Sequence, residues 1–303
     1  MKTTATFFRR GAGALAGLAA LLCLHAAHAA GTVDTVGGGP YAGNLSPFGY
    51  TDGDTAVVSQ FNGPSGLAFD STGNFLFVAD RTNNAVRKLD LPNNRTTSFA
   101  SNNHSQVFAP VDLVLDGADN VYVLNRANGT NGFIAKFNKY RNFITNLVTG
   151  LTNATALTID GNTNLFVIER GGAIKRVTRT GAVTNLARLT FPGVRLQGIA
   201  LTDTGNLVVS DANSNAIWQV NLISGNITLL TGGNGPGDGF GDPAYVQFNQ
   251  PEHITRAGDG SFVVADRGNN RVKLVDVNGI VTPLYGMNSN LWLYPPFAAY
   301  PGW

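Results

Sequence analysis

Side chains suited to acid–base or metal chemistry are few in this 303-residue chain. Of its four histidines, only His104 and His253 lie beyond the first thirty residues, and Cys23 is its single cysteine. His253 follows directly on Glu252. An imidazole beside a carboxylate can bind a divalent cation or act as an acid and a base. The alternative is a purely structural role, in which His253 is hydrogen-bonded within the packed interior of the fold.

A second set of polar residues recurs along the chain. Five apolar runs end in an acid or an amide, and an arginine follows four of them: Asp80, Asn125, Glu169, Asp211 and Asp266, then Arg81, Arg126, Arg170 and Arg267. On one rim of a fold these charges could hold a charged ligand. We expect a structural role instead, in which the acids and the amide cap turn backbone and the arginines pair along or between sheets.

The glycine-rich run Gly232–Gly241 superficially resembles a phosphate-binding loop. Such a loop needs a following helix, whose N-terminal amides hold the phosphates. No helical periodicity follows this run, so it predicts a flexible connection, as does its counterpart at residues 37–60.

Short self-similar segments must position all these residues. Apolar runs such as Leu67–Phe69 and Phe75–Ala79 flank Asp/Asn/Gly turns, which is the chemistry of tight antiparallel connections. First strands are expected at residues 66, 112, 156, 198 and 253, and three further strands follow each. Four strands in a period of about 40–50 residues indicate the blades of a β-propeller. The absence of a helical pattern beyond residue 30 removes the parallel α/β classes.

Two of the units also carry a recognisable motif. The first reads Phe61-Asn-x-Pro64-x-Gly-Leu-Ala and then Val-Ala-Asp80-Arg-x-Asn-Asn-x-Val-Arg87. The fifth repeats it as Phe248-Asn-x-Pro251 and Val-Val-Ala-Asp266-Arg-Gly-Asn-Asn-Arg-Val272. These units resemble NHL repeats, and the resemblance extends over residues 32 to about 286. It implies a six-bladed propeller of the exported, bacterial NHL type.

Position-matched differences among the units suggest a site. Where three units begin their innermost strand with Gly66, Ala156 or Gly198, the second has Asp112 and the fifth has His253. In a six-fold ring the second and fifth blades lie opposite each other, so these side chains could face one ligand at the mouth of the axial channel.

Propeller enzymes of similar shape include amidating lyases, strictosidine synthase-like proteins and gluconolactonase-like hydrolases. The lyases use several channel histidines with a metal. Because His104 is expected in a loop, the chain cannot assemble a three-histidine site. No cofactor is therefore predicted. The alternative is a lyase or lactonase-like enzyme in which Asp112, Glu252 and His253 hold a divalent cation such as calcium or zinc.

Residues 1–30 have the features of a secretory signal peptide. Lys2, Arg9 and Arg10 precede the apolar stretch Gly11–Leu24, and Ala27-His-Ala29 offers small residues for cleavage. Removing this leader leaves 18 basic against 19 acidic side chains. Nucleic acid is not an expected partner, because a basic face is its usual footprint. The sequence predicts an exported bacterial protein, periplasmic, cell-surface or extracellular, with no membrane span in the mature chain.

The strand count predicts an unfinished ring. Thr32–Val36 reads as a fourth strand that lacks the three before it, and it would belong to a sixth blade. Residues 287–303 resemble the start of another inter-blade loop. The expected divisions are a signal peptide at 1–30, a propeller at 31–286, and a loop start or truncated tail at 287–303. The rival interpretation is an open five-bladed chain whose gap a partner fills.

Aromatic side chains gather in the long loops before the first and fifth units and in the tail: Tyr41, Phe48, Tyr50, Phe240, Tyr245, Trp292, Tyr294 and Trp303. On one rim they would suit sugar or peptide recognition, or equally they would pack the loops onto the ring. The sequence thus predicts an all-β binding module, without a catalytic residue, for a protein, peptide or carbohydrate. Its candidate ligand-binding residues are Asp112, Glu252, His253, Tyr50 and Tyr245.

Overall fold

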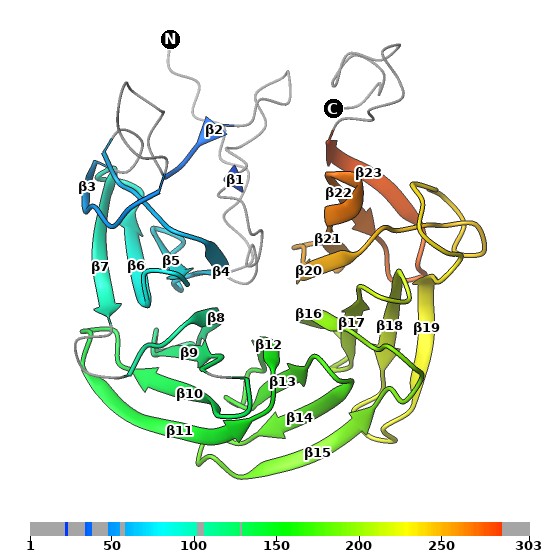
Figure 1. The fold of residues 1–303 in the computed structure, drawn as a ribbon, viewed down its shortest axis with the longest axis horizontal. Helices are drawn as coiled ribbons and strands as arrows, with labels where there is room; N and C mark the ends of the chain where they lie inside the picture. The colour runs from blue at the N-terminus through cyan, green and yellow to red at the C-terminus, as the bar shows by residue number, and fades with distance from the viewer. Residues whose placement is uncertain are drawn as a thin grey trace.

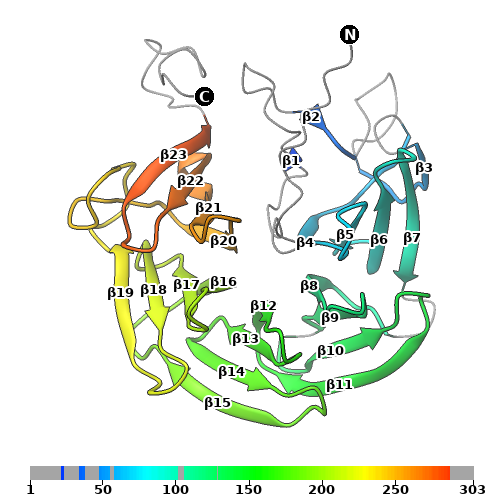
Figure 2. The same ribbon diagram turned by 180° about the vertical axis from the view of Figure 1, so that it is seen from behind.

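The computed structural model describes residues 22–23, 34–37, 48–54, 58–101, 106–127 and 129–286. Five four-stranded antiparallel sheets stand around a common axis as the blades of a β-propeller (Figures 1 and 2). In every blade the four main strands are hydrogen-bonded in sequence order, with the first strand innermost, and in blade 1 a further short strand adds outside the fourth. The predicted all-β fold with five complete four-stranded blades is confirmed.

The blades divide the chain as follows. Blade 1 contains β4 (Pro64–Phe69), β5 (Phe75–Asp80), β6 (Ala85–Asp90) and β7 (Arg95–Ser101). Blade 2 contains β8 (Pro110–Leu115), β9 (Val121–Asn125), β10 (Gly132–Phe137) and β11 (Phe143–Leu151). Blade 3 contains β12 (Ala154–Ile159), β13 (Leu165–Glu169), β14 (Ala173–Val177) and β15 (Val183–Arg188). Blade 4 contains β16 (Leu196–Leu201), β17 (Leu207–Asp211), β18 (Ala216–Val220) and β19 (Ile227–Gly232). Blade 5 contains β20 (Pro251–Arg256), β21 (Phe262–Asp266), the 3-10 turn η2 (Arg267–Asn269), β22 (Arg271–Val275) and β23 (Val281–Gly286).

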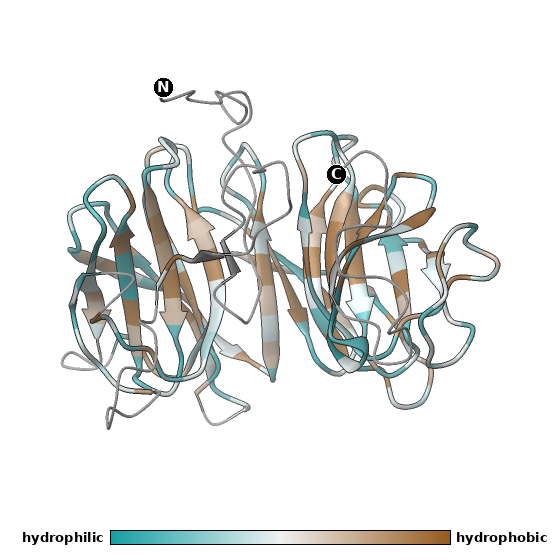
Figure 3. Cartoon of the chain, turned by 90° about the horizontal axis from the view of Figure 1, so that it is seen from above, coloured by the Kyte–Doolittle hydropathy of each residue, from teal (hydrophilic) through white to brown (hydrophobic). Residues whose placement is uncertain are grey.

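Apolar cores lie between neighbouring blades. Val123 in β9 packs toward blade 1, whereas the next residue, Leu124, packs toward blade 3. Both faces of the strand are therefore buried, which explains why these strands are continuously apolar rather than alternating. Phe99 of blade 1 joins the first core edge-to-face, with its ring 5.0 Å from Phe77 and 6.1 Å from Phe137. Figure 3 shows hydrophobic strands through the ring and mostly hydrophilic turns at its two rims.

Blades 1 and 5 face each other across an opening in the ring (Figure 1). The short strands β1 (Leu22–Cys23) and β2 (Asp34–Thr35) pair with each other in this opening. Val36 packs onto blade 1 beside Phe61 and Leu67.

The strand expected at Thr32–Val36 is thus present at 34–35, but its pairing differs from the expectation. Its partner is β1, which lies within the expected leader, and not a strand of any described blade. A strand edge pairs with whichever edge is available, and the described residues offer β2 no sixth-blade strand. The tail at 287–303 lies outside the described residues.

One buried hydrogen bond recurs in all five blades. The residue that ends the second strand accepts from a backbone N–H just before the innermost strand, at 2.7–2.8 Å. The donor–acceptor pairs are Asn62–Asp80, Phe108–Asn125, Thr152–Glu169, Arg195–Asp211 and Asn249–Asp266. We call these five acceptors the cap residues. All five acceptors are buried, and each satisfies a backbone donor where the chain enters the innermost strand. The acids and the amide thus cap backbone, as predicted, but the backbone is that of the incoming connection and not that of the turn. Asp211 also accepts from a turn N–H, that of Asn213.

Three of the four acidic cap residues have a cation beside them on the third strand. Arg87, Lys175 and Lys273 occupy equivalent positions in the third strands of blades 1, 3 and 5. Each forms an ion pair with the cap residue of its own blade, at 3.2, 2.5 and 2.8 Å. In blade 4 the equivalent position is Trp218, and Asp211 accepts instead from Asn213 N–H and the Ser214 hydroxyl.

Blade 2 has Ala135 at the same position, opposite Val123, and its cap residue is the neutral Asn125. The Nδ2 of Asn125 donates to the Val123 carbonyl oxygen at 3.1 Å. A carboxylate there would face this carbonyl instead of donating to it.

We therefore expect Asn125→Asp to destabilise the fold at neutral pH. The substitution buries a negative charge against a carbonyl oxygen, and the loss of stability should be about 2 kcal/mol or more. Urea unfolding at pH 7 measures it. Asn138→Asp is the matched control, because half-buried Asn138 accepts from Tyr140 and Asn142 N–H just as Asp276 accepts from its own turn in blade 5. Equal stability of the two variants would contradict this account of Asn125.

Candidate ligand-binding rim

Two kinds of segment meet on one rim of the propeller. These are the turns between second and third strands and the connections that lead into the innermost strands. A backbone hydrogen bond of 2.7–3.2 Å joins turn to connection in each blade: Thr82 to Asn62, Arg126 to Ala109, Arg170 to Asn153, Ala212 to Arg195 and Gly268 to Asn249. We call this side the connection rim. The expectation that these segments share a rim is confirmed.

The long connections before blades 1 and 5 fold alike. Asn83 and Asn269, in equivalent turns, donate from Nδ2 to the carbonyl oxygens of Gly49 and Gly237 at 2.7 and 2.6 Å. The chain then reaches the outermost strand in both blades. β3 (Gly53–Asp54) pairs with β7 as a fifth strand, and Gly241 pairs with Val281 of β23.

Gly232–Gly241 is therefore a built part of blade 5 and not the flexible connection that we expected. Glycine content alone suggested flexibility, but the docking partners lie up to about 40 residues further along the chain. No helix follows this run within residues 233–250, so the phosphate-loop interpretation gains no support.

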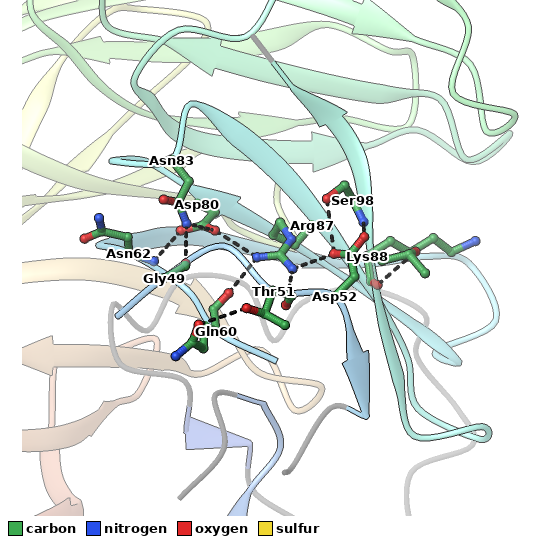
Figure 4. Close-up of polar contacts among 11 residues, drawn as sticks. Gly49, Thr51, Asp52, Gln60, Asn62, Asp80, Asn83, Arg87, Lys88 and Ser98 are labelled. Carbon is green, nitrogen blue, oxygen red and sulfur yellow. Dashed lines mark hydrogen bonds and ion pairs between the residues drawn. The ribbon is translucent and has the colours of Figure 1, made fainter. Parts of the chain in front are cut away.

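A buried guanidinium holds the blade 1 connection in place (Figure 4). Arg87 is fully buried in β6. Its Nη1 donates to the Gln60 carbonyl at 2.7 Å and to Asp80 at 3.2 Å. Its Nη2 donates to the Thr51 carbonyl at 2.7 Å and to Asp52 at 2.6 Å. The guanidinium thus joins the cap residue to both ends of the loop.

Aromatic rings enclose the same guanidinium. Its carbon lies 4.7 Å from the ring centroid of Tyr50 and 5.1 Å from that of Phe61. Rings at this distance stabilise a cation that has lost its water. Tyr50, a predicted ligand-binding residue, therefore has a structural contact with Arg87 and remains 47% exposed.

Lys273 holds the connection loop of blade 5 in place in the same way. Its ammonium lies 2.8 Å from Asp266, 3.1 Å from Asp238 and 2.8 Å from the Gln247 carbonyl oxygen. The rings of Phe240 and Phe248 lie 4.7 and 4.9 Å away.

The acid and the aromatic ring have exchanged places between the two loops. Counted from Gly49, the loop of blade 1 presents Tyr50 and then Asp52, whereas from Gly237 blade 5 presents Asp238 and then Phe240. Asp52 and Asp238 were not among the site residues predicted from the sequence. The Asp-Gly pairs at 52–53 and 238–239 were the available signal.

Burial affects the carboxylates of this network differently. It raises the pKa of Asp80 despite hydrogen bonds from Asn62, Asn83 and Arg87. At half-exposed Asp52, burial is outweighed by the hydrogen bond from the Ser98 N–H and by Arg87, which lower its pKa. The exposed partner therefore stays ionised to lower pH than the buried one.

Asp112 joins the innermost strands of two blades. It is buried in β8 and accepts from Leu113 N–H and from Leu157 N–H of blade 3, both at 2.9 Å. Burial raises the pKa of its carboxyl to about 7, against an ordinary value of 3.8. A Cβ at Gly66 of blade 1 would collide with Asp112, which accounts for the glycine at the matching position.

Glu252 and His253 lie at the start of β20. Glu252 is 3.2 Å from the Arg267 guanidinium and 3.9 Å from that of Arg195 in the connection to blade 4. His253 is half-buried, and burial lowers its pKa to about 4, so it is neutral at pH 7. The backbone at 252–254 packs directly on Gly198 of blade 4.

The structure does not gather the predicted residues into one site. Within the described ranges, no three His, Cys, Asp or Glu side chains are placed to hold a metal ion together. Asp112 is engaged by blade 3 and Glu252 by arginines. Tyr245 stands apart on the blade 5 loop and is 77% exposed. His104, Tyr41, Trp292, Tyr294 and Trp303 lie outside the described residues.

The arginines that follow the cap residues behave unequally. Arg267 pairs with Glu252, as expected of such residues. Arg81, Arg126 and Arg170 form no ion pair with any carboxylate in the described part of the chain. The expected pairing thus holds for one of the four.

This arrangement defines a β-propeller whose connection rim is built from docked loops. Residues 61–89 match the family model of the NHL repeat, so the first blade contains an NHL repeat, as its motif predicted.

One curated relative is the Arabidopsis thaliana protein SUPPRESSOR OF QUENCHING 1, chloroplastic, at 26% identity over 251 residues. The match covers 77% of this chain and 21% of that protein, so the chain spans about a fifth of the relative's length.

Solved structures share the fold at low identity. An auxiliary nutrient binding protein from Bacteroides thetaiotaomicron matches with a TM-score of 0.69 and 18% identity over 84% of this chain and 64% of its own. Virginiamycin B lyase from Staphylococcus aureus matches with a TM-score of 0.56 and 17% identity over 75% of this chain and 73% of its own. Among the described residues, no helix has the length and apolarity needed to cross a membrane.

We expect Arg87→Met to destabilise the fold by about 3–5 kcal/mol, the usual cost of leaving a buried carboxylate without its cation. Asp80 would lose its counter-ion, and the loop at 48–60 would lose its anchor. Urea unfolding measures the loss. Arg179→Met is the control, because Arg179 is exposed in a turn on the opposite rim. A loss below about 1 kcal/mol, the value of a surface ion pair, would contradict the anchoring role.

Asp112 should impose a particular pH dependence. A carboxyl whose pKa is raised by folding contributes its stability below the unfolded pKa and loses it as pH rises through the folded pKa. Between its ordinary pKa of 3.8 and about 7, the wild type should therefore lose stability relative to Asp112→Asn as pH rises. Urea unfolding of both proteins at pH 4, 5, 6 and 7 gives the difference, in which His253 cancels. A difference that stays constant with pH would show that Asp112 has an ordinary pKa.

Proposed function

We propose that this propeller is an exported binding module that takes a peptide or carbohydrate on its connection rim. The observation that carries the proposal is the exposure of aromatic side chains on loops that are themselves anchored. Phe48, Tyr50 and Tyr245 are 59%, 47% and 77% exposed, although buried cations fix the loops that bear them. Aromatic rings on a preorganised surface bind sugar faces and peptide side chains at low entropic cost.

Further support comes from the charge balance and from the structural likeness. Beyond the expected leader, the chain has nearly equal numbers of acidic and basic residues, which does not favour nucleic acid. Two auxiliary nutrient binding proteins of Bacteroides share the fold with TM-scores of 0.69 and 0.66. The apolar leader favours export to the periplasm, the cell surface or the medium.

A propeller enzyme that uses a divalent cation at Asp112, Glu252 and His253 is the alternative. Asp112 and Glu252 are each engaged by other groups, and no three metal-ligating side chains converge in the described residues, so the binding module is the better supported of the two. A stoichiometric divalent ion in the purified protein, lost in His253→Ala, would reverse this preference.

We expect Tyr245→Ala to weaken binding of whichever sugar or peptide a glycan and peptide array identifies. Losing one stacked ring should lower the affinity about tenfold, as a loss of roughly 1.5 kcal/mol does. Isothermal titration calorimetry measures the affinity. Tyr140→Ala is the control, since Tyr140 is 72% exposed in the turn at 138–142 on the opposite rim. Equal affinities of the two variants would place the ligand elsewhere on the molecule.

A further inference from the structure

Three arginines occupy one position in three consecutive blades. Arg81, Arg126 and Arg170 each follow the cap residue at the end of the second strand, so all three belong to the connection rim. The N–H groups of Arg126 and Arg170 donate to the residues just before β8 and β12, at 3.2 and 3.0 Å. Their backbones are thus fixed beside the innermost strands, in neighbouring blades (Figure 1).

The side chain of Arg126 extends from blade 2 toward the connection that precedes Arg170. Nη2 of Arg126 reaches across to blade 3, where it lies 3.4 Å from Oδ1 of Asn153. Burial, together with the positive charges of Arg81 and Arg170, lowers the pKa of Arg126.

Among the described residues, the three arginines have no carboxylate partner. The other side of the same rim differs in this respect. There Glu252 serves both Arg195 and Arg267. No described carboxylate forms an ion pair with Arg81, Arg126 or Arg170, so their mutual repulsion has no such compensation in this part of the chain. Like charges without a counter-ion repel one another, and an anion that binds between them would offset that repulsion.

We propose that Arg81, Arg126 and Arg170 form an oxyanion subsite on the connection rim, which takes a carboxylate, sulfate or phosphate group of the ligand. The planar guanidinium fork matches the paired oxygens of all three groups and can donate two parallel hydrogen bonds to them. The assignment rests on the proposed function, because it places the ligand on the same rim. It narrows the ligand to an acidic sugar or an acidic peptide.

The experiment titrates the full chain separately with sulfate, inorganic phosphate and citrate. Isothermal titration calorimetry at low ionic strength measures the affinity for each anion. The three probes distinguish the chemical source of the oxyanion. Arg126→Gln should weaken the preferred anion about tenfold or more, the factor expected for a lost charge-assisted hydrogen bond. Arg126→Lys keeps the charge but loses the fork, so it too should weaken binding.

Arg179→Gln is the matched control, because it makes the same change of charge in an exposed turn on the opposite rim. Equal weakening by Arg126→Gln and Arg179→Gln would show general electrostatic attraction and overturn the subsite, as would failure of every anion to bind. If a neutral sugar or peptide still binds and depends on Tyr245, the proposed function stands and the subsite alone is wrong. If the anion depends on Arg126 while no ligand depends on Tyr245, the oxyanion site stands and the aromatic rim is wrong.

Discussion

The structure depends on one buried hydrogen bond that each blade repeats. An acid or amide at the end of the second strand accepts from the backbone just before the innermost strand. This bond satisfies a donor that would otherwise be lost at the point where the chain turns into the ring. It also fixes the turn after the second strand beside the incoming connection. Every feature of the connection rim follows from that juxtaposition.

The buried cations extend the same device outward in blades 1 and 5. Arg87 and Lys273 each neutralise their own cap residue and then reach the connection loop through carbonyl oxygens, a second acid and two aromatic rings. A cation can stay dry in this way because acids, carbonyl oxygens and aromatic rings together replace most of its water. The ring precedes the acid in one loop (Tyr50, Asp52) and follows it in the other (Asp238, Phe240), yet both loops surround the cation with a ring and an acid. The position of these groups in space, and not their order in the sequence, is therefore what the two loops share.

Charge is distributed unevenly around the connection rim. In blades 4 and 5 a single carboxylate, Glu252, serves two arginines, whereas the arginines of blades 1 to 3 have no described acid beside them. The buried polar residues of the innermost strands belong to the wall instead, because Asp112 joins blades 2 and 3 and the backbone at His253 packs on Gly198. Ligand recognition is thus better sought on the rim than among the residues that first suggested a channel site.

The sequence by itself determined the blades, because strand and turn patterns are local and recur five times. It also predicted that residues such as Asp80 and Asp266 cap backbone, since their place in the repeat is visible without coordinates. Only the tertiary structure decided what Arg87, Asp112 and Gly232–Gly241 do. The partners that decide this lie 27 to 45 residues away along the chain and depend on how the loops and blades pack. Position in a repeat shows where a side chain starts, but long-range packing decides which groups surround its charged end.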